Sequence, residues 1–294
     1  MENYYSIGRA CKICDITPRT LRYYEEIGLV TPDKTDQDNG YRYYTISTLR
    51  YVQAIRYLVD QGFSLDDIQN AMAKDDIQVL RDLFMRQIHE TQNQIDFYHQ
   101  RMDSLKDWCG LLLEGEQVLK HKKFRPYVRY FPEELYFVYE RETGSGELDS
   151  DAYIETEYFT RSKQDGHSMV DVGGAFNLMY DSYEERMSGT YQKQSLMQVI
   201  YEKHQSMEGT RQFGGFNVVT AYHVGNPKGL TDTYRKLLKW ADQHCFTLRG
   251  DCIERKVIDV YSTKDVKKFV TEILLPIDED AEAQGLLHQW RHED

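Results

Sequence analysis

Arginine and tyrosine side chains gather in two short segments near the start of the chain. The first is residues 17–26 (TPRTLRYYEE) and the second is residues 40–44 (GYRYY). Thr17 can accept a hydrogen bond from a free amide of a first helical turn, and Pro18 has no amide to satisfy there, so a helix is expected to begin at this point. Exposed guanidinium and phenol groups bind phosphates by charge and by hydrogen bonds. The two segments therefore predict a surface suited to a polyanion.

A second set of residues combines carboxylates with aromatic rings. Glu254 and Glu272 fall within strand-like stretches beside aromatic residues. A buried carboxylate is costly unless it is paired or offered to a cationic ligand, and aromatic faces attract cations. Arg255 and Lys256 could instead satisfy Glu254 by a salt bridge, and strand aromatics are often core residues. The ligand hypothesis names Glu254, Glu272, Tyr136, Tyr139, Phe176, Tyr222 and Tyr261.

Two of the five cysteines, Cys11 and Cys14, have a spacing found in metal and redox sites. The pair lies within a predicted helix and no second pair accompanies it, whereas a structural zinc needs four ligands. An odd number of cysteines spread over 294 residues also argues against a disulfide framework. We therefore expect reduced cysteines that pack in the core, with no metal and no other cofactor.

Capping and turn signals predict a small N-terminal domain over residues 1–73. A helix capped by Ser6 precedes the helix that begins at Pro18, and the short break between them gives helix-turn-helix geometry. Turn-forming residues at 36–40, followed by a returning strand at 41–45, indicate a wing. A third helix and a fourth helix follow, and the third presents Leu49, Val52, Ile55 and either Leu58 or Val59 on one face.

Residues 75–119 predict one long helix, because the segment contains no proline and no glycine before Gly110. Apolar residues recur at alternating steps of four and three, the spacing of a coiled-coil seam. A helix packed on its own domain is the alternative, but the segment is several-fold longer than a usual globular helix. We therefore expect a coiled coil that forms a homodimer. Its seam is Phe84, Ile88, Thr91, Ile95, Tyr98, Met102, Leu105, Cys109 and Leu112.

Residues 121–294 predict a third part with alternating, aromatic-rich strands. Helical patterns near 150–163 and at 231–245 lie between the strands. The expected fold class is therefore α+β, with an N-terminal winged helix-turn-helix, a long dimerising helix and a C-terminal α+β domain. The predicted strands are residues 135–139, 175–180, 216–222, 253–261 and 269–277.

The net charge of −12 is unevenly distributed. Residues 1–73 hold eight basic and ten acidic side chains, and residues 39–59 hold three arginines and no carboxylate. One strip of the first domain can thus meet phosphates without repulsion. The start of the chain lacks the pattern of a secretory signal and no apolar run is long enough for a membrane span, so we expect a cytoplasmic protein without membrane association.

The N-terminal domain resembles the MerR family of transcription regulators. The resemblance rests on residues 5–8 (YSIG), 20–25 (TLRYYE), 40–44 (GYRYY) and 62–68 (GFSLDDI), in that order and spacing. It implies that the second helix contacts DNA and that residues from the wing side anchor the flanking phosphates. One of the two adjacent tyrosines could instead pack beneath the wing. The implied contacts are Arg19, Arg22, Tyr23, Tyr24, Tyr41, Arg42 and Arg56.

The C-terminal part resembles the GyrI-like domain of the multidrug branch of that family. The resemblance rests on residues 215–222, 234–245, 251–254 and 270–276. It implies a dimer that distorts promoter DNA for RNA polymerase when a lipophilic, cationic small-molecule effector is bound. It also implies that Glu254 supplies the counter-charge to that effector.

Two other functions compete with this one. Some GyrI-like domains are hydrolytic, and a glutamate pair in an aromatic pocket could act as a base. No nucleophile paired with a base forms a recognisable motif here, so we expect no enzyme activity. The C-terminal domain could also bind a protein or peptide, in which case small organic cations would fail to bind.

Overall fold

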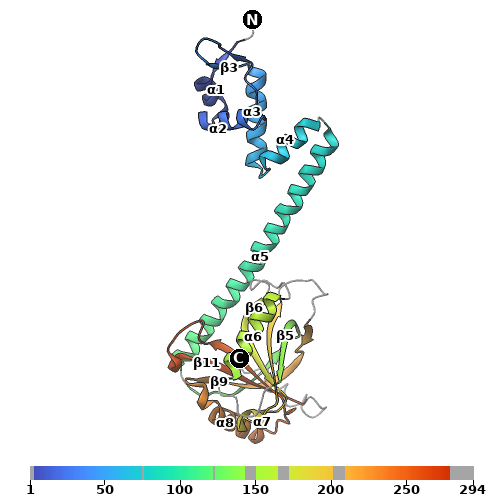
Figure 1. The fold of residues 1–294 in the computed structure, drawn as a ribbon. Helices are drawn as coiled ribbons and strands as arrows, with labels where there is room; N and C mark the ends of the chain where they lie inside the picture. The colour runs from blue at the N-terminus through green and yellow to red at the C-terminus, as the bar shows by residue number, and fades with distance from the viewer. Residues whose placement is uncertain are drawn as a thin grey trace. The chain divides into compact units, whose positions relative to one another are not determined.

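The computed structural model describes residues 3–74, 76–121, 123–142, 150–164, 172–200 and 209–278. The chain divides into two compact units, Met1–Ile95 and Asp96–Asp294. The division falls inside one long helix (Figure 1). The sequence predicted three parts instead, residues 1–73, 75–119 and 121–294. Asp75 and the segment 279–294 of those predicted domains lie outside the described residues.

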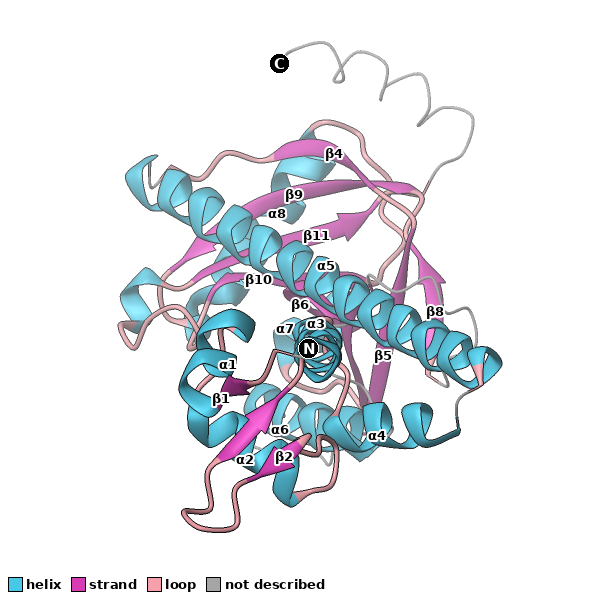
Figure 2. Ribbon diagram, turned by 90° about the horizontal axis from the view of Figure 1, so that it is seen from above, coloured by secondary structure: helices cyan, strands magenta, loops and turns pink. Residues whose placement is uncertain are grey.

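The first unit contains the predicted helix-turn-helix and wing. Thr17 caps α2 by accepting a hydrogen bond from the Thr20 amide at 3.0 Å, and Pro18 occupies the first helical position. Strands β2 and β3 pair as an antiparallel hairpin whose loop projects from the helices (Figure 2). The elements are β1 (Tyr5–Ser6), α1 (Ile7–Cys14), α2 (Pro18–Glu26), β2 (Lys34–Thr35), β3 (Arg42–Tyr44), α3 (Ile46–Asp60) and α4 (Leu65–Lys74).

The core of the first unit forms where the apolar faces of its helices meet. Leu21 of α2 and Leu49, Val52 and Ile55 of α3 are almost fully buried, as the sequence predicted for α3. Cys11 and Cys14 belong to the same core, and burial raises the pKa of both thiols. Their surroundings are therefore apolar packing.

Helix α5 runs from Ile77 to His121, close to the predicted 75–119. Phe84, the first seam residue, packs against Phe63 in the core of the first unit, with ring centroids 4.8 Å apart. Later seam residues are exposed in the single chain. The exposed large side chains of the seam are Ile88, Ile95, Tyr98, Met102, Leu105 and Leu112.

The second unit is built on an eight-stranded antiparallel sheet with strand order β4-β9-β11-β10-β6-β7-β5-β8. The predicted strands correspond to β5, β6, β9, β10 and β11, while β4, β7 and β8 were not predicted. The strands are β4 (Tyr127–Phe131), β5 (Glu134–Glu142), β6 (Val172–Tyr180), β7 (Lys193–Ile200), β8 (Thr210–Phe213), β9 (Phe216–Val224), β10 (Cys252–Ile258) and β11 (Val270–Pro276).

Helices cover the two faces of this sheet differently. One face, here called the helix-covered face, packs against α6 (Ser150–Gln164) and α8 (Leu230–Gln243) through Tyr158, Tyr234 and Leu237. Helix α7 (Tyr183–Ser188) was not predicted, and two short 3-10 helices, Pro227–Gly229 and Val266–Lys268, complete the unit.

The opposite face, here called the cavity face, is crossed by the C-terminal part of α5 (Figure 2). Leu111 of α5 packs against Val257 and Val270 of β10 and β11. Gly115 permits the close approach, since a Cβ at this position would lie 2.3 Å from the Ile258 side chain. No helix within the described ranges is long and apolar enough to cross a membrane.

Candidate functional site

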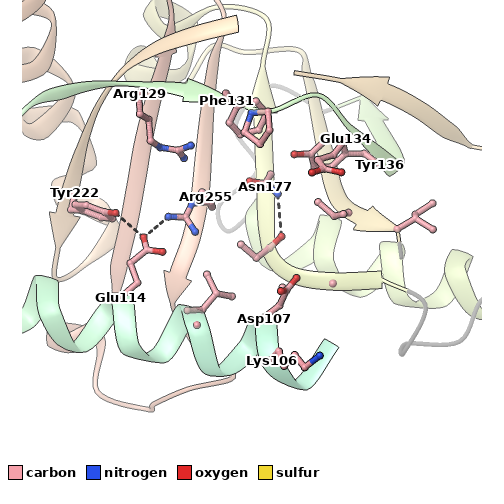
Figure 3. A pocket seen from close by; sticks show the side chains of 18 of the residues that line it. Lys106, Asp107, Glu114, Arg129, Phe131, Glu134, Tyr136, Asn177, Tyr222 and Arg255 are labelled. Carbon is pink, nitrogen blue, oxygen red and sulfur yellow. Dashed lines mark hydrogen bonds and ion pairs between the residues drawn. The ribbon is translucent and has the colours of Figure 1, made fainter. Parts of the chain in front are cut away.

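A cavity of about 900 Å³ lies between α5 and the cavity face of the sheet. Residues 106–114 of α5 form one wall, and strands β4, β5, β6, β7, β9 and β10 contribute the rest. The volume falls within the range of small-molecule sites. Its charged and aromatic lining residues are Tyr127 and, as labelled in Figure 3, Lys106, Asp107, Glu114, Arg129, Phe131, Glu134, Tyr136, Tyr222 and Arg255.

A fully buried carboxylate, Glu272 of β11, lies beneath two of the lining arginines. Arg129 donates to both of its oxygens at 2.9 Å, and Arg255 donates at 2.6 Å. Thr220 donates a further bond at 2.9 Å. Burial alone would raise the pKa of Glu272, but Arg255 and Arg129 outweigh it and lower the pKa to about 2. Glu272 is therefore a structural anion that holds two arginine side chains toward the cavity.

Helix α5 joins this network through Glu114. Its carboxylate accepts a hydrogen bond from Tyr222 at 2.7 Å and pairs with Arg255, as Figure 3 shows. Arg255 thus bridges Glu114 of the helix and Glu272 of the sheet. Burial, followed by the charge of Glu272, raises the pKa of Tyr222, so its hydroxyl stays protonated and donates.

Aromatic rings form the end of the cavity next to β4 and β5. Phe131 stacks on Tyr136 with centroids 6.4 Å apart and an interplanar angle of 12°. Burial, followed by the charge of Glu134, raises the pKa of Tyr136 to about 12. This end of the cavity offers apolar contact area with the Glu134 carboxylate beside it.

The structure brings only part of the predicted ligand set together within the described residues. Tyr136 and Tyr222 line the cavity, and Glu272 lies directly behind Arg129 and Arg255. The other four predicted residues lie elsewhere.

Glu254 requires a correction, because it lies on the helix-covered face. It is fully buried, and its two oxygens accept from Arg186 at 2.8 and 3.2 Å, while Tyr234 donates at 3.1 Å. Side chains alternate along a strand, and Arg255 occupies the cavity face of β10. The partner of Glu254 is therefore Arg186 of α7, which was not predicted as a helix.

Phe176, Tyr139 and Tyr261 also lie away from the cavity lining. Phe176 is in the core of the helix-covered face, and Tyr139 packs against the same core and donates to Glu157 at 3.3 Å. Tyr261 follows the end of β10, and its ring lies 5.4 Å from that of Phe176. Strand alternation places Phe176 and Tyr139 on this face. Tyr261 was predicted to lie in a strand over residues 253–261, but β10 ends at Ile258.

The predicted DNA contacts divide into exposed side chains and residues that hold the unit together. Arg19, Arg22 and Tyr23 of α2 are exposed, as is Tyr41 at the wing. Tyr24 is 5% exposed and belongs to the core. The helix turns one of its two adjacent tyrosines inward, so Tyr24 is corrected to a packing residue.

Arg42 and Arg56 make internal contacts that position the wing and α3. Arg42 pairs with Glu25 of α2 at 2.7 Å, which ties the wing to the second helix. Arg56 donates to the Cys14 carbonyl at 2.8 Å and pairs with Asp15 at 2.9 Å, which satisfies the end of α1. Both remain partly exposed, so each can combine these contacts with a phosphate.

Sequence reasoning missed several residues of the cavity. Arg129 lies in a strand that was not predicted, and Arg255 was weighed only as a partner of Glu254. Glu114 was treated as part of a long helix, and Asn177 was not singled out. The available signal was the alternation of β10, which places Glu254 and Arg255 on opposite faces whichever face is chosen.

The fold and the cavity define the class of transcription regulators that join a DNA-binding winged helix-turn-helix to a ligand-binding domain. Residues 5–75 match the MerR HTH family regulatory proteins, and residues 126–278 match the GyrI-like small molecule binding domain. The chain belongs to the MerR family and carries a GyrI-like domain, as its sequence motifs predicted.

Relatives support the same assignment over both parts. The multidrug-efflux transporter 1 regulator of Bacillus subtilis (strain 168) is 25% identical over 287 residues, which are 95% of this chain and 99% of that protein. The transcriptional regulator BrlR of Pseudomonas aeruginosa is 38% identical over 93 residues, 31% of this chain and 34% of that protein. Both relatives are named as regulators, in agreement with the two domains that the family models match.

A solved structure also aligns with the chain. The cryo-EM structure of an EcmrR–DNA complex in EcmrR-RPo covers 94% of this chain and 100% of that chain, with 19% identity and a TM-score of 0.43.

Proposed function

We propose that this protein is an effector-responsive transcription activator that senses a lipophilic cation in the cavity between α5 and the sheet. The observation that carries the proposal is the position of Glu114, which belongs to α5 and also to the cavity wall. A ligand that changes the contacts of Glu114 acts on the helix that begins in the DNA-binding unit.

The charge of the cavity supports a cationic ligand. Three basic residues line it, namely Lys106, Arg129 and Arg255. Lys106 pairs with Asp103, and the two arginines are engaged by Glu272 and Glu114. Asp107 and Glu134 are two further lining carboxylates. Together with Glu114 and the buried Glu272 they make four acidic side chains against three basic ones. Aromatic walls beside a carboxylate favour an apolar cation.

Homodimerisation through α5 is the second part of the proposal. Apolar seam residues from Ile88 to Leu112 are exposed in the single chain, and a second copy of the helix would bury them. We accordingly propose residues 1–73 as the DNA-binding part, 75–119 as the dimerisation helix and 121–294 as the effector-binding part.

Promoter DNA and RNA polymerase are the proposed macromolecular partners. Membership of the MerR family supports both, and the exposed Arg19 and Arg22 provide phosphate contacts in each copy. Two such units meeting one operator suit activation by distortion of the promoter. The relative that is named for a multidrug-efflux transporter supports a target gene of that kind.

The test compares tetraphenylphosphonium with tetraphenylborate, which have the same shape and opposite charge. We expect calorimetry on the full-length protein to show binding of the phosphonium only. Glu134→Gln should weaken that binding about tenfold, and Glu133→Gln, a neighbouring exposed residue outside the lining, should leave it unchanged. Tighter binding of the borate would overturn the proposed ligand charge.

A transcription assay tests the regulatory part of the proposal. With RNA polymerase and the operator DNA, tetraphenylphosphonium should raise transcript yield for the wild-type protein and less so for Glu134→Gln. A yield that does not respond to a cation that binds would contradict effector-controlled activation.

A further inference from the structure

Four polar side chains form a row across the cavity face of the sheet. Asn177 of β6 lies opposite Arg255 of β10, and Arg255 lies opposite Glu272 of β11. Glu272 in turn lies opposite Tyr222 of β9. Residues directly opposite each other in antiparallel strands share a face. Arg255 is therefore held in the middle of the sheet, on the face that the C-terminal part of α5 crosses.

The guanidinium of Arg255 has three nitrogens, and acidic partners engage two of them. Nε donates to Glu272 at 2.6 Å, and Nη2 donates to Glu114 of α5. One contact comes from the sheet and the other from the helix, so together they fix the plane of the guanidinium. The third nitrogen, Nη1, donates to no residue in the described part of the chain.

This third nitrogen is accessible from the cavity. Among the described residues, the side-chain nitrogens and oxygens that are both buried and without a partner do not include Arg255 Nη1, so the atom has exposed surface. Arg255 lines the cavity and keeps 17% of its side chain exposed. Figure 3 shows its guanidinium in the space between the sheet and α5. Arg255 therefore presents a free N–H donor to the cavity.

Arg129, the other lining arginine that binds Glu272, has no such donor. Its Nε and Nη2 atoms donate to the two Glu272 oxygens, and its Nη1 donates to the Tyr130 carbonyl at 3.4 Å. Two neighbouring arginines thus share one buried carboxylate, but only the guanidinium of Arg255 has a nitrogen left for a ligand. This difference makes Arg129 a matched control for Arg255.

The charge of the cluster decides which acceptor suits the donor. Arg129 and Arg255 carry two positive charges, and Glu272 and Glu114 carry two negative charges. A carboxylate on the ligand would add an uncompensated charge close to Glu114, which is costly in a partly buried site. A neutral carbonyl oxygen adds no charge and still accepts a charge-assisted hydrogen bond.

We propose that the effector is a lipophilic cation that also carries a neutral oxygen acceptor, such as a ketone or amide carbonyl, to which Arg255 Nη1 donates. The inference rests on the proposed function of the cavity as the effector site. Water can satisfy Nη1 in an open cavity, but an effector without an acceptor displaces that water and leaves the N–H groups unpaired. The structure thus assigns a preference that neither charge nor lipophilicity gives.

The test uses tetraphenylphosphonium with one para substituent, either acetyl or ethyl. The two probes have the same charge and nearly the same shape, and the acetyl probe is the less lipophilic. Calorimetry on the full-length wild-type protein should show about tenfold tighter binding of the acetyl probe. Equal binding, or tighter binding of the ethyl probe, would overturn the inference while leaving the cavity as a cation site.

A third probe with a para carboxylate tests the choice of a neutral acceptor. It offers oxygen atoms at the same place and adds a negative charge, so it should bind more weakly than the acetyl probe. Tighter binding of the carboxylate probe would overturn the neutral acceptor in favour of an anionic one.

Two variants assign the preference to one nitrogen. Arg255→Lys keeps a positive charge between Glu272 and Glu114 but has no Nη1, so it should lose the preference for the acetyl probe. Arg129→Lys also removes a guanidinium from Glu272, yet it should keep the preference, whatever its effect on both affinities. A preference that survives Arg255→Lys, or one that both variants lose, would overturn the role of Arg255 Nη1.

Unsubstituted tetraphenylphosphonium separates this inference from the proposed function. If neither the acetyl nor the ethyl probe binds but tetraphenylphosphonium does, only the acceptor inference fails. If tetraphenylphosphonium also fails, the proposed function fails with it.

Discussion

The hydroxyl of Tyr222 donates to the carboxylate of Glu114 at 2.7 Å, and this bond joins strand β9 to helix α5. Because Arg255 pairs with the same carboxylate, one acidic side chain anchors the helix to two strands of the sheet. Arg255 and Glu114 are both mostly buried, so solvent screens their ion pair less than it screens a pair on the surface.

Replacing Glu114 should therefore loosen the attachment of α5. We expect Glu114→Gln to lower the free energy of unfolding of the second unit by about 1–2 kcal/mol, between the values for surface and buried pairs. All three tryptophans lie in residues 96–294, so urea unfolding followed by tryptophan fluorescence reports on this unit. Glu116→Gln, an exposed control on the same helix, should change the free energy by less than about 0.5 kcal/mol. Equal effects of the two variants would contradict the anchoring role.

The ion pairs of Glu272 predict an acid-sensitive second unit. Its pKa is lowered from 4.5 to about 2 in the folded protein, so the unfolded chain takes up a proton first as the pH falls. The stabilisation is complete above pH 4.5 and is lost as the pH falls toward 2, a change of about 3 kcal/mol.

Urea unfolding at intervals between pH 6 and pH 2.5 measures this change. Glu272→Gln should be less stable at pH 6, and its free energy of unfolding should fall less steeply below pH 4.5. A carboxyl resonance of Glu272 that titrates near 4.5 in the folded wild type would show that the arginines do not hold its charge.

Arg22 is expected to act through DNA phosphates. It is exposed on α2 and forms no hydrogen bond or ion pair with a described residue, so its charge is available. Arg22→Ala should weaken operator binding and reduce the slope of log K against log salt by about one. Arg81→Ala, an exposed arginine of α5 outside the winged domain, should leave the slope unchanged. Fluorescence anisotropy at several salt concentrations measures both, and a slope equal to that of the wild type would remove Arg22 from the phosphate contacts.

The α5 seam predicts the oligomeric state. Ile95→Glu places a charge where two helices are expected to meet, so the dimer should dissociate at least about tenfold more readily. Gln94→Glu adds the same charge at the preceding position, which is outside the seam, and should leave the dimer intact. Analytical ultracentrifugation distinguishes these results, and a monomeric wild-type protein would exclude the proposed coiled coil.

Residue patterns along the sequence were sufficient to predict much of the fold. The spacing of Leu49, Val52 and Ile55 identified the buried face of α3, and the absence of helix breakers located α5 within two residues at each end. These features depend on neighbours along one helix, so the sequence contains the necessary information.

The cavity depends on relations that periodicity does not contain. Alternation shows that Glu254 and Arg255 lie on opposite faces but not which face meets α5. Arg129 belongs to a strand whose residues do not alternate clearly between apolar and polar. Asn177 follows an irregularity in β6, and only the pairing of β6 with β7 reveals that irregularity.

Leu111 and Leu112 are consecutive residues of α5, yet one is buried against the sheet and the other belongs to the exposed seam. Two surfaces of one helix must therefore keep a fixed rotational phase. A single residue inserted before Met102 would turn the earlier part of the seam by about 100° relative to the later part, whereas seven inserted residues would restore the phase to within about 20°. The proposed coiled coil would therefore constrain the length of this helix to steps of whole heptads, and sequence variation between relatives is expected to respect that period.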